Sequence, residues 1–484
     1  MSNDSPLRLP IELDTTSNGE FAPVPLGPAA RFANRRARER AFESARRLGA
    51  SRRTFLRSAC GAACSLLAMN EAFARAGLRG GAYEVAPEAA LEPELAAAAV
   101  GGDEFIFDIQ GHHVTPARPW RERSDFWERT VRGFPHADCG FADEIECFSA
   151  RQYVKEIFLD SDTDLAVLSF VPEPDLESAP LLIEEAAATR AIVESLAGTQ
   201  RLLLHGPVHP NFPGELERME ELAERWKVAA WKTYTQYGPQ GKGYWLDDER
   251  TGIPFIEKAR SLGIKVVCVH KGFPLPGMED AYGTCRDIGA VARRYPDVHF
   301  IVYHSGYETQ TIEGAYAATG PARGIDSLIR SLRDHEVPPG SNVYAELGST
   351  WRFLMRAPDQ AAHALGKLLR YVGEDRVLWG TDSIWYGSPQ DQIQAFRSFQ
   401  ISEALREKHG YPQITPAIRA KVFGLNAARP YGIAPAEAKR RARADGVQRA
   451  RLAYREAPAP GFATYGPRTR REFVRLWRLR GGTP

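Results

Sequence analysis

The chain has 484 residues, of which 43% are hydrophobic and 25% charged, and its formal net charge is +1 at pH 7. This composition is typical of a globular protein and excludes a chain that is disordered throughout. The near-neutral charge gives no support for a nucleic-acid-binding protein. No apolar run reaches the ~18 residues that a membrane span needs, so we expect no stable span.

The first 76 residues have the features of a disordered leader that carries an export signal. Residues 1–30 are rich in Pro, Gly, Asn and Ser, and residues 31–53 carry many arginines with a helical rhythm. The stretch Ser51-Arg-Arg-Thr-Phe-Leu-Arg57 resembles the twin-arginine signal of bacteria, and a mildly apolar segment with small-residue cleavage sites follows it. We predict a periplasmic or exported protein that uses the twin-arginine machinery. The alternative is an arginine-rich surface helix on a cytoplasmic protein.

Residues 77–104 are expected to form a linker, and from residue 105 short apolar runs alternate with amphipathic stretches. The runs are rich in Val, Ile, Leu and aromatics, which is typical of strands buried on both faces. The expected strands are 105–110, 165–171, 201–206, 228–235, 264–270, 299–304, 343–347 and 377–381. The expected helices are 179–196, 213–226, 254–262, 283–295, 325–334, 361–371 and 389–399.

Eight such repeats predict an α/β protein with a (β/α)8 TIM barrel at residues 105–432. An open doubly wound sheet is the alternative, but no Gly-x-Gly-x-x-Gly follows the first strand. A long insertion (113–147) follows the first strand, with a helix at 149–159, and residues 421–432 form a closing helix. The basic C-terminal extension (433–484) includes an amphipathic helix at 468–478 that packs on the barrel or on a neighbouring subunit of a homo-oligomer.

Polar side chains stand at the ends of several expected strands. Asp108, Gln110 and His112 alternate along the first strand, so they point to the same face. The fifth and sixth strands end in His270 and His304, and Asp382 follows the eighth. Because active sites of this fold lie at the carboxyl ends of the strands, we expect these groups to share one pocket. Imidazoles and a carboxylate are ligands that a divalent metal such as zinc prefers.

This set of residues resembles the amidohydrolase superfamily, and in particular its amidohydrolase-related branch, which includes aminocarboxymuconate semialdehyde decarboxylase and lactone hydrolases. That branch has Asp-x-His-x-His on the first strand, His on the fifth and sixth, Asp on the eighth, and an Asn-Ala-x-Arg-x-Tyr/Phe-Gly closing helix. The matching positions here are Asp108, His112, His270, His304, Asp382 and Asn426-Ala-Ala-Arg-Pro-Tyr-Gly432. The resemblance covers roughly residues 105–432.

The chain departs from the family at Gln110, which stands where the first histidine of the His-x-His pair belongs. Three outcomes follow. One divalent metal is held by His112, His270 and Asp382 with Gln110 as a weak ligand; or a different metal such as manganese replaces zinc; or the site works without metal by acid–base chemistry. The resemblance implies that His304 is a general base or acid, and that Asp382 both binds metal and shuttles a proton.

Four further residues are candidates for substrate binding. Lys232, on the fourth strand, suits a substrate carboxylate or phenolate, and Glu346, on the seventh, is placed to pair with it. A carboxylated Lys232 bridging two metals is disfavoured because the His-x-His pair is incomplete. Tyr234 and Trp385 lie just past strand ends and favour a flat or aromatic small-molecule substrate.

The leading hypothesis is a metal-dependent hydrolase that attacks a small cyclic ester, amide or related compound with metal-activated water. The second is a non-oxidative decarboxylase of a carboxylated, aromatic-like substrate. A third, from another class, is a non-catalytic binding protein on a degenerate barrel, which Gln110 suggests. Cys268 is expected to be buried, and Cys139 and Cys147 to form a disulfide or remain free.

Overall fold

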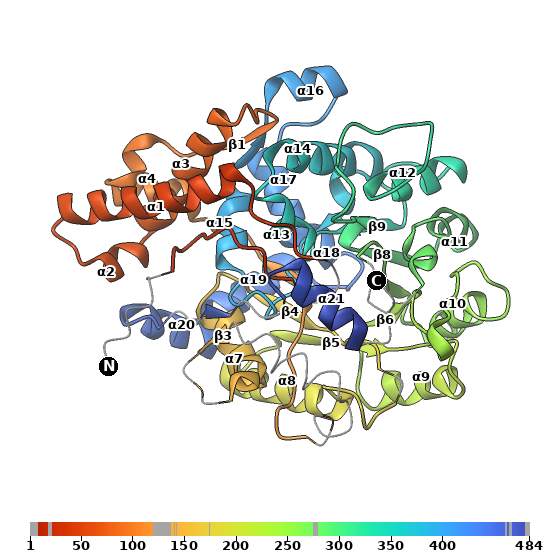
Figure 1. The fold of residues 1–484 in the computed structure, drawn as a ribbon. Coiled ribbons are helices and arrows are strands. Elements are labelled where there is room, and N and C mark those ends of the chain that lie inside the picture. Colours follow the sequence, from red (N-terminus) through yellow and green to blue (C-terminus); the bar gives the residue numbers. More distant parts are fainter. Residues whose placement is uncertain are drawn as a thin grey trace.

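The computed structural model describes residues 8–17, 22–118, 120, 137–139, 141, 143–173, 175–273, 279–459, 462–463 and 467–479. At its centre is an eight-stranded parallel sheet with the order β10-β9-β8-β7-β6-β5-β4-β2 (Figure 1). The strands are β2 (Phe107–Gly111), β4 (Leu165–Leu168), β5 (Leu202–Pro207), β6 (Ala230–Tyr234), β7 (Val266–His270), β8 (His299–Tyr303), β9 (Val343–Glu346) and β10 (Val377–Leu378).

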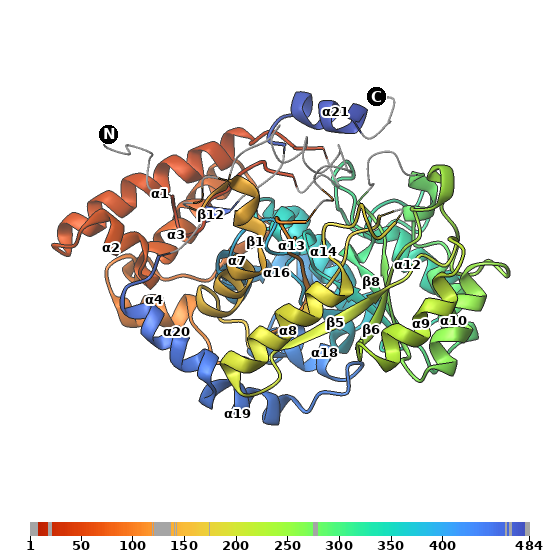
Figure 2. The same cartoon turned by 90° about the horizontal axis from the view of Figure 1, so that it is seen from below.

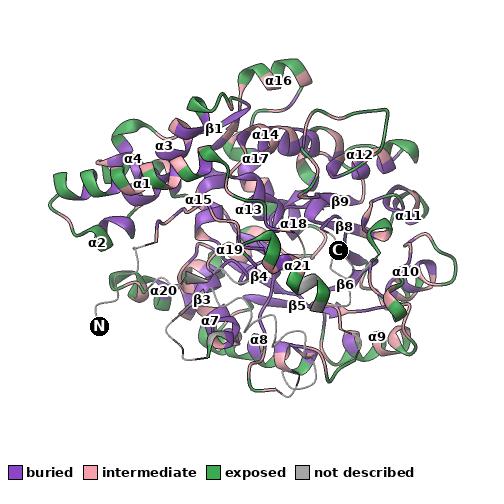
Figure 3. Ribbon diagram, viewed as in Figure 1, coloured by how far each residue is buried: buried purple, intermediate pink, exposed green. Residues whose placement is uncertain are grey.

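Backbone hydrogen bonds join the first strand to the chain that follows the last one, which closes the sheet. The amide of Ile109 donates to the backbone carbonyl of Trp379, at 3.2 Å, and the amide of Asp382 donates to the backbone carbonyl of Gln110, at 2.9 Å. Gly111 forms a parallel bridge with Ser383. The predicted (β/α)8 barrel is therefore confirmed, and the inner strands are buried while the outer helices present exposed faces (Figure 3).

Helices follow the strands around the barrel, close to their predicted positions. They are α7 (Ala150–Val154), α8 (Ile183–Ala197), α9 (Glu215–Glu224), α10 (Gly252–Ser261), α11 (Ile288–Arg294), α12 (Ile325–Asp334), α14 (Pro358–Lys367) and α15 (Gln390–Ser398). The eighth strand is shorter than the predicted 377–381, because the Thr381 amide donates to the Asp108 side chain and not to a backbone carbonyl of a neighbouring strand. Asp382, just beyond it, adopts a left-handed conformation with φ 59°.

The described residues of the leader are not disordered, so that expectation is wrong. Helices α1 (Pro28–Arg47), α2 (Arg52–Leu56) and α3 (Ala59–Arg75) pack together beside the barrel (Figure 1). Alanines spaced by three or four residues give α1 a narrow apolar stripe that α3 can approach closely. The buried alanines of that stripe are Ala30, Ala33, Ala37, Ala41 and Ala45.

The expected linker is also structured. It contains β1 (Gly81–Tyr83), which pairs antiparallel with β11 (Phe399–Ile401), and α4 (Pro93–Val100). The hydroxyl of Tyr83 donates to the carbonyl of Met355, so this segment is tied to the barrel's own loops.

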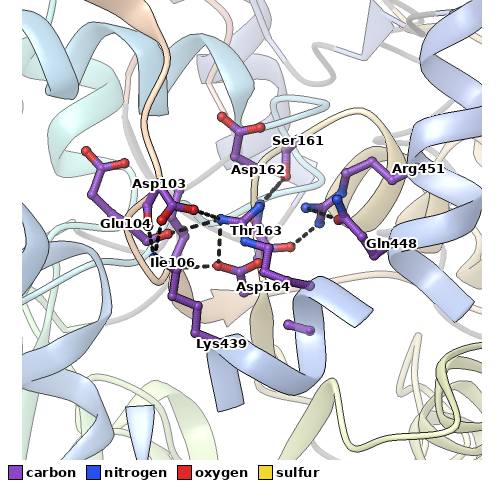
Figure 4. A network of polar contacts seen from close by, with 12 residues as sticks. Asp103, Glu104, Ile106, Ser161, Asp162, Thr163, Asp164, Lys439, Gln448 and Arg451 are labelled. Atoms are coloured by element: carbon purple, nitrogen blue, oxygen red, sulfur yellow. Dashed lines mark hydrogen bonds and ion pairs between the residues drawn. The ribbon is translucent and has the colours of Figure 1, made fainter. Parts of the chain in front are cut away.

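Helices from the closing region and the first part of the C-terminal extension pack on the barrel. The closing region contains α17 (Pro416–Ala420) and α18 (Asn426–Ala428), and the Asn426 amide donates to the carbonyls of Glu374 and Val377. Helices α19 (Pro435–Ala444) and α20 (Gly446–Glu456) contact the loops before β2 and β4 (Figure 4). Helix α21 (Arg470–Leu479), predicted at 468–478, lies over the opposite end of the barrel (Figure 2).

Two smaller features complete the fold. Cys139 and Cys147 form a disulfide within the insertion, and Cys268 is buried inside the barrel as expected. Among the described helices, none combines the length and apolar character that crossing a membrane requires.

Candidate active site

The predicted site residues lie together at the carboxyl ends of the strands, in the closed interior of the barrel. Gln110 and His112 come from the end of β2, His270 ends β7, and His304 directly follows β8. Glu346 ends β9, and Asp382 lies just beyond β10. Each of these side chains belongs to a residue that is at most 2% exposed. Burying so many polar groups is costly unless they contact one another or a ligand.

Asp382 is the hub of this cluster. Its Oδ1 accepts a hydrogen bond from Gln110 Nε2 at 3.1 Å and lies 3.1 Å from His112 Nε2. Its Oδ2 accepts from Ser349 Oγ at 2.5 Å. Burial alone would raise the pKa of Asp382, but the hydrogen bond and charge of His112 hold this pKa below its usual range. The carboxylate is therefore ionised and anchors three donors at one point.

His270 and His304 lie beside each other, with ring centroids 4.7 Å apart. His270 Nε2 is 3.0 Å from the carbonyl oxygen of Phe273, and His304 Nδ1 is 2.6 Å from that of Gly348. Because a carbonyl only accepts, each of these nitrogens carries the proton in the neutral ring, and the other nitrogen presents a lone pair.

Burial, together with the charges of Lys232 and His112, lowers the pKa of His304 to about 4, against the opposing effects of Asp382 and the Gly348 carbonyl. Burial also lowers the pKa of His270. Both imidazoles are consequently neutral at pH 7, the form that accepts a proton or ligates a metal.

Glu346 and Lys232 add two buried titratable groups. Glu346 accepts hydrogen bonds from the backbone amides of His304, at 2.9 Å, and Gly348, and burial raises its pKa to about 8. At pH 7 this carboxyl carries a proton. Lys232 lies within β6, two residues before its end, and its Nζ is 3.4 Å from the ring centroid of Tyr303 and 4.8 Å from that of Tyr234. Its charge also lowers the pKa of Glu346, so the predicted pair interacts electrostatically.

The two predicted aromatic residues pack against the histidines. Trp385 stacks on His112 with ring centroids 5.6 Å apart, and Tyr234 stacks on His270 at 4.7 Å. Both are buried. These rings fix the orientation of the imidazoles, a role that strand-end position alone did not indicate.

Asp108 faces the seam between the first and last strands. It accepts hydrogen bonds from the amides of Gln110 and Thr381, each at 3.1 Å, and from the Thr381 hydroxyl. Burial raises the pKa of Asp108 to about 7. These hydrogen bonds connect β2 to the segment that follows β10, so Asp108 stabilises the closure of the barrel next to the site.

Sequence reasoning missed Ser349, which donates to Asp382 and contacts the Tyr386 hydroxyl at 2.8 Å. The sequence could have indicated Ser349, because Gly348 and Ser349 directly follow the apolar strand 343–347 and so stand at a strand end like the other site residues. Ser349 has φ 53°, a left-handed conformation that turns the chain sharply at the rim.

The donor types present fit a divalent cation. Metal-ligating histidines commonly donate their second ring N–H to a backbone carbonyl, as His270 does here. The Oε1 atom of Gln110 is buried with no hydrogen-bond partner, which is unusual for an amide oxygen. Within the described residues, however, no three His, Cys, Asp or Glu side chains are arranged to enclose an ion. In this conformation Gln110 and His112 donate to Asp382 instead.

A parallel eight-stranded barrel with buried acid, imidazole and ammonium groups at its carboxyl rim is the architecture of a TIM-barrel enzyme. The family model for amidohydrolases matches residues 141–433, more than half of the chain, and the chain therefore belongs to the amidohydrolase family. The chain matches no curated protein significantly.

Solved structures with a similar arrangement have low sequence identity to this chain. An uncharacterised TIM-barrel protein from Bordetella bronchiseptica is 17% identical, with a TM-score of 0.44, over 68% of this chain and 99% of that one. The 5-carboxyvanillate decarboxylase of Sphingomonas paucimobilis is 14% identical, with a TM-score of 0.42 over the same shares. The 4-oxalomesaconate hydratase of Rhodopseudomonas palustris is 14% identical, with a TM-score of 0.37 over 73% of this chain and 99% of that one.

Proposed function

We propose that the chain is a hydrolase that opens a small cyclic ester, amide or related compound, with His304 as general base. The observation that carries the proposal is the convergence of the strand-end groups on Asp382, beside a neutral His304. A general base must be unprotonated at the working pH and held in a fixed orientation. His304 meets both conditions, because burial lowers its pKa and the Gly348 carbonyl fixes its ring.

His112, His270 and Asp382, with the amide oxygen of Gln110, would hold one divalent metal, zinc or manganese. When bound, such a metal lowers the pKa of a coordinated water and polarises a substrate carbonyl. The chain's own groups supply the remaining chemistry. His304 Nε2 accepts a proton from the attacking water, and Asp382 stabilises the imidazolium that forms. The buried ammonium of Lys232 attracts the negative charge that develops on the carbonyl oxygen.

Non-oxidative decarboxylation is the second candidate, and the protonated Glu346 favours it. This reaction replaces a carboxylate by a proton, so carbon dioxide leaves and an acid must protonate the carbon. Glu346 is a buried acid with a pKa of about 8, so it holds a proton at pH 7, and Lys232 would bind the substrate carboxylate. The site residues therefore support both reactions, which differ in whether His304 removes a proton or Glu346 delivers one.

Product analysis separates the two. The purified chain is incubated with a panel of lactones and a panel of aryl carboxylic acids, and acid release and carbon dioxide release are measured. His304→Asn is compared with His299→Asn, a matched control because His299 lies at the opposite end of β8. We expect lactone opening to fall by about 10²–10⁴-fold in His304→Asn and to stay near wild type in His299→Asn.

Two other outcomes have defined meanings. Carbon dioxide release that depends on Glu346, without lactone opening, would select the decarboxylase. Ligand binding without turnover, unchanged in His304→Asn, and no metal in the purified protein would select the non-catalytic binding protein. Elemental analysis of the same sample distinguishes zinc from manganese.

We also propose export by the twin-arginine route. Arg52 and Arg53 are exposed on α2, where receptor proteins can reach them, and Ser51 caps the helix by accepting from the Thr54 amide. Fractionation of cells that express the wild type and an Arg52→Lys/Arg53→Lys double variant tests this. If the protein is exported, the wild type should be periplasmic and the variant should stay in the cytoplasm. If both stay in the cytoplasm, the arginines are surface residues and not an export signal.

A further inference from the structure

Residues 8–17, which we call the roof segment, cross the carboxyl rim of the barrel and are held on two sides. The side chain of Asn34 on α1 bonds both the amide and the carbonyl of Leu13, at 3.0 and 2.6 Å. On the other side the Thr15 hydroxyl donates to the carbonyl of Arg468, at 3.0 Å, and the Ser17 amide to that of Pro467, at 2.9 Å. The roof segment thus lies between the N-terminal helices and the C-terminal segment that leads into α21 (Figure 2).

Asp14 joins the roof segment to the barrel through two arginines. Both of its carboxylate oxygens contact Nη2 of Arg352, at 2.9 and 3.0 Å. Arg352 lies in the short helix α13 (Thr350–Leu354), and Arg356, just beyond it, donates to the backbone carbonyl of Asp14. Asp14 therefore neutralises a guanidinium whose side chain is only 10% exposed.

A short series of contacts leads from Arg352 to the candidate site. The guanidinium carbon lies 4.3 Å from the ring centroid of Tyr386. The Tyr386 hydroxyl is 2.8 Å from Ser349 Oγ, which in turn donates to Asp382. The arginine bound by Asp14 is therefore two residues removed from the hub of the site.

The space between the roof segment and the site is too small for a substrate. The cavity lined by Leu13, Asp14, Ser349, Arg352 and Tyr386 holds about 20 Å³, which is room for about one water molecule. Sites for organic ligands have volumes on the order of 300–1,000 Å³. A ligand that reaches Asp382 from this side must displace the roof segment.

Displacement would leave a cationic subsite on the barrel. Of the carboxylates in the described part of the barrel, Asp391 would remain beside Arg352 and Arg356, with its Oδ2 3.9 Å from Nη1 of Arg352. Two positive charges against one negative charge leave a net +1. Arg8, which also acts on Asp14 and Asp391, belongs to the roof segment and would move with it.

The outer surface of the same rim is also basic. Four exposed arginines of α21 line an open hollow of about 640 Å³; they are Arg470, Arg471, Arg475 and Arg478. Figures 1 and 2 both place α21 over this end of the barrel. Clustered positive charge on a surface raises the local concentration of anions and their association rate.

We propose that the roof segment is a displaceable cover, and that Asp14 occupies the position that a carboxylate of the substrate takes on Arg352. The inference rests on the proposed function, because it assumes that the strand-end site binds a substrate. It adds the class of that substrate, a small organic carboxylate, and a competition between it and the chain's own Asp14. Apparent affinity then depends on the fraction of molecules in which the roof is displaced.

Calorimetric titration of the full chain with benzoate and with the neutral analogue benzamide tests the proposal. Asp14→Asn keeps the size of the side chain and removes the competing charge, so we expect benzoate to bind about tenfold more tightly while benzamide changes much less. Arg352→Met should lower the preference for benzoate over benzamide and remove the gain that Asp14→Asn gives. Glu71→Gln is the matched control, because Glu71 also bonds two arginines, Arg36 and Arg40, but between α1 and α3.

An unchanged benzoate-to-benzamide ratio in Asp14→Asn would overturn the proposal, as would an equal gain in Glu71→Gln, which would indicate general loosening of the N-terminal helices. Arg352→Lys retains the charge and should preserve part of the preference if Arg352→Met folds poorly. Because the titration needs no turnover, it is independent of the His304→Asn result. A wild type that opens lactones but shows no preference for benzoate over benzamide would refute the displaceable roof. A wild type that prefers benzoate but opens no lactone would refute the hydrolase and leave the roof standing.

Discussion

Asp445→Ala tests whether the C-terminal helices are an integral part of the barrel. Asp445 binds Arg201, just before β5, through Nε at 2.6 Å and Nη2 at 2.8 Å, and both side chains are 1% exposed. It also caps α20, because its side chain accepts from the Gln448 amide at 2.9 Å. The alanine variant would leave the Arg201 guanidinium buried without its counter-charge.

The expected cost is about 3–5 kcal/mol in the free energy of unfolding, the range for removing one partner of a buried ion pair. The cap contributes about 1 kcal/mol by itself, although the two effects share one carboxylate and do not simply add. Burial would raise the pKa of Asp445, but Arg201 and the Gln448 amide hold it below its usual range. The contribution is therefore present above the unfolded pKa of ~3.9 and is lost as pH falls below it.

Urea unfolding followed by the fluorescence of the nine tryptophans measures this difference. Asp103→Ala is the control, since Asp103 pairs with Lys439 on the same helices but its side chain is 82% exposed, and it should cost less than about 1 kcal/mol. In the double variant Arg201→Met/Asp445→Ala part of the loss should be recovered. A loss below 1 kcal/mol for Asp445→Ala, equal to the control, would refute the view that the extension is integral to the fold.

Three further predictions concern the site and the opposite rim. Lys232→Met should weaken inhibition by anionic substrate analogues at least tenfold and leave inhibition by neutral analogues unaffected. The reason is that a buried ammonium at ~4 Å from an anion contributes several kcal/mol to the binding free energy. Equal effects on both kinds of analogue would contradict a role for the charge. Dialysis against a chelator should reduce activity, and zinc or manganese should restore it, as measured by turnover and elemental content; full activity in a metal-free sample would select the acid–base alternative. Burial would raise the pKa of Asp162, but Arg397, at 2.6 Å, holds it well below its usual range. Asp162→Asn should therefore lower the unfolding free energy by about 1.5–3 kcal/mol at pH 7, and the difference from wild type should shrink as pH falls from ~4 towards 2. A constant difference across that pH range would assign the effect to packing.

The sequence by itself determined the barrel and the positions of its strand-end groups. Apolar runs that end in His270, His304 and Asp382 recur with helical stretches between them, and in a parallel barrel all carboxyl ends meet at one rim. Side chains alternate along a strand, and this alternation placed Gln110 and His112 on the inner face of the first strand. These conclusions depend only on local periodicity and on the direction of the chain.

Only the tertiary structure decided what contacts these groups make. Ser349 contacts Asp382 from a left-handed turn, and Asp14 binds Arg352 from a segment more than 300 residues away. No local sequence pattern predicts such long-range contacts. The leader looked disordered because its first 30 residues are rich in Pro, Gly, Asn and Ser. Its stability comes instead from the alanine stripe of α1 packed against α3, and long-range packing of small residues has no signal in a single segment's composition.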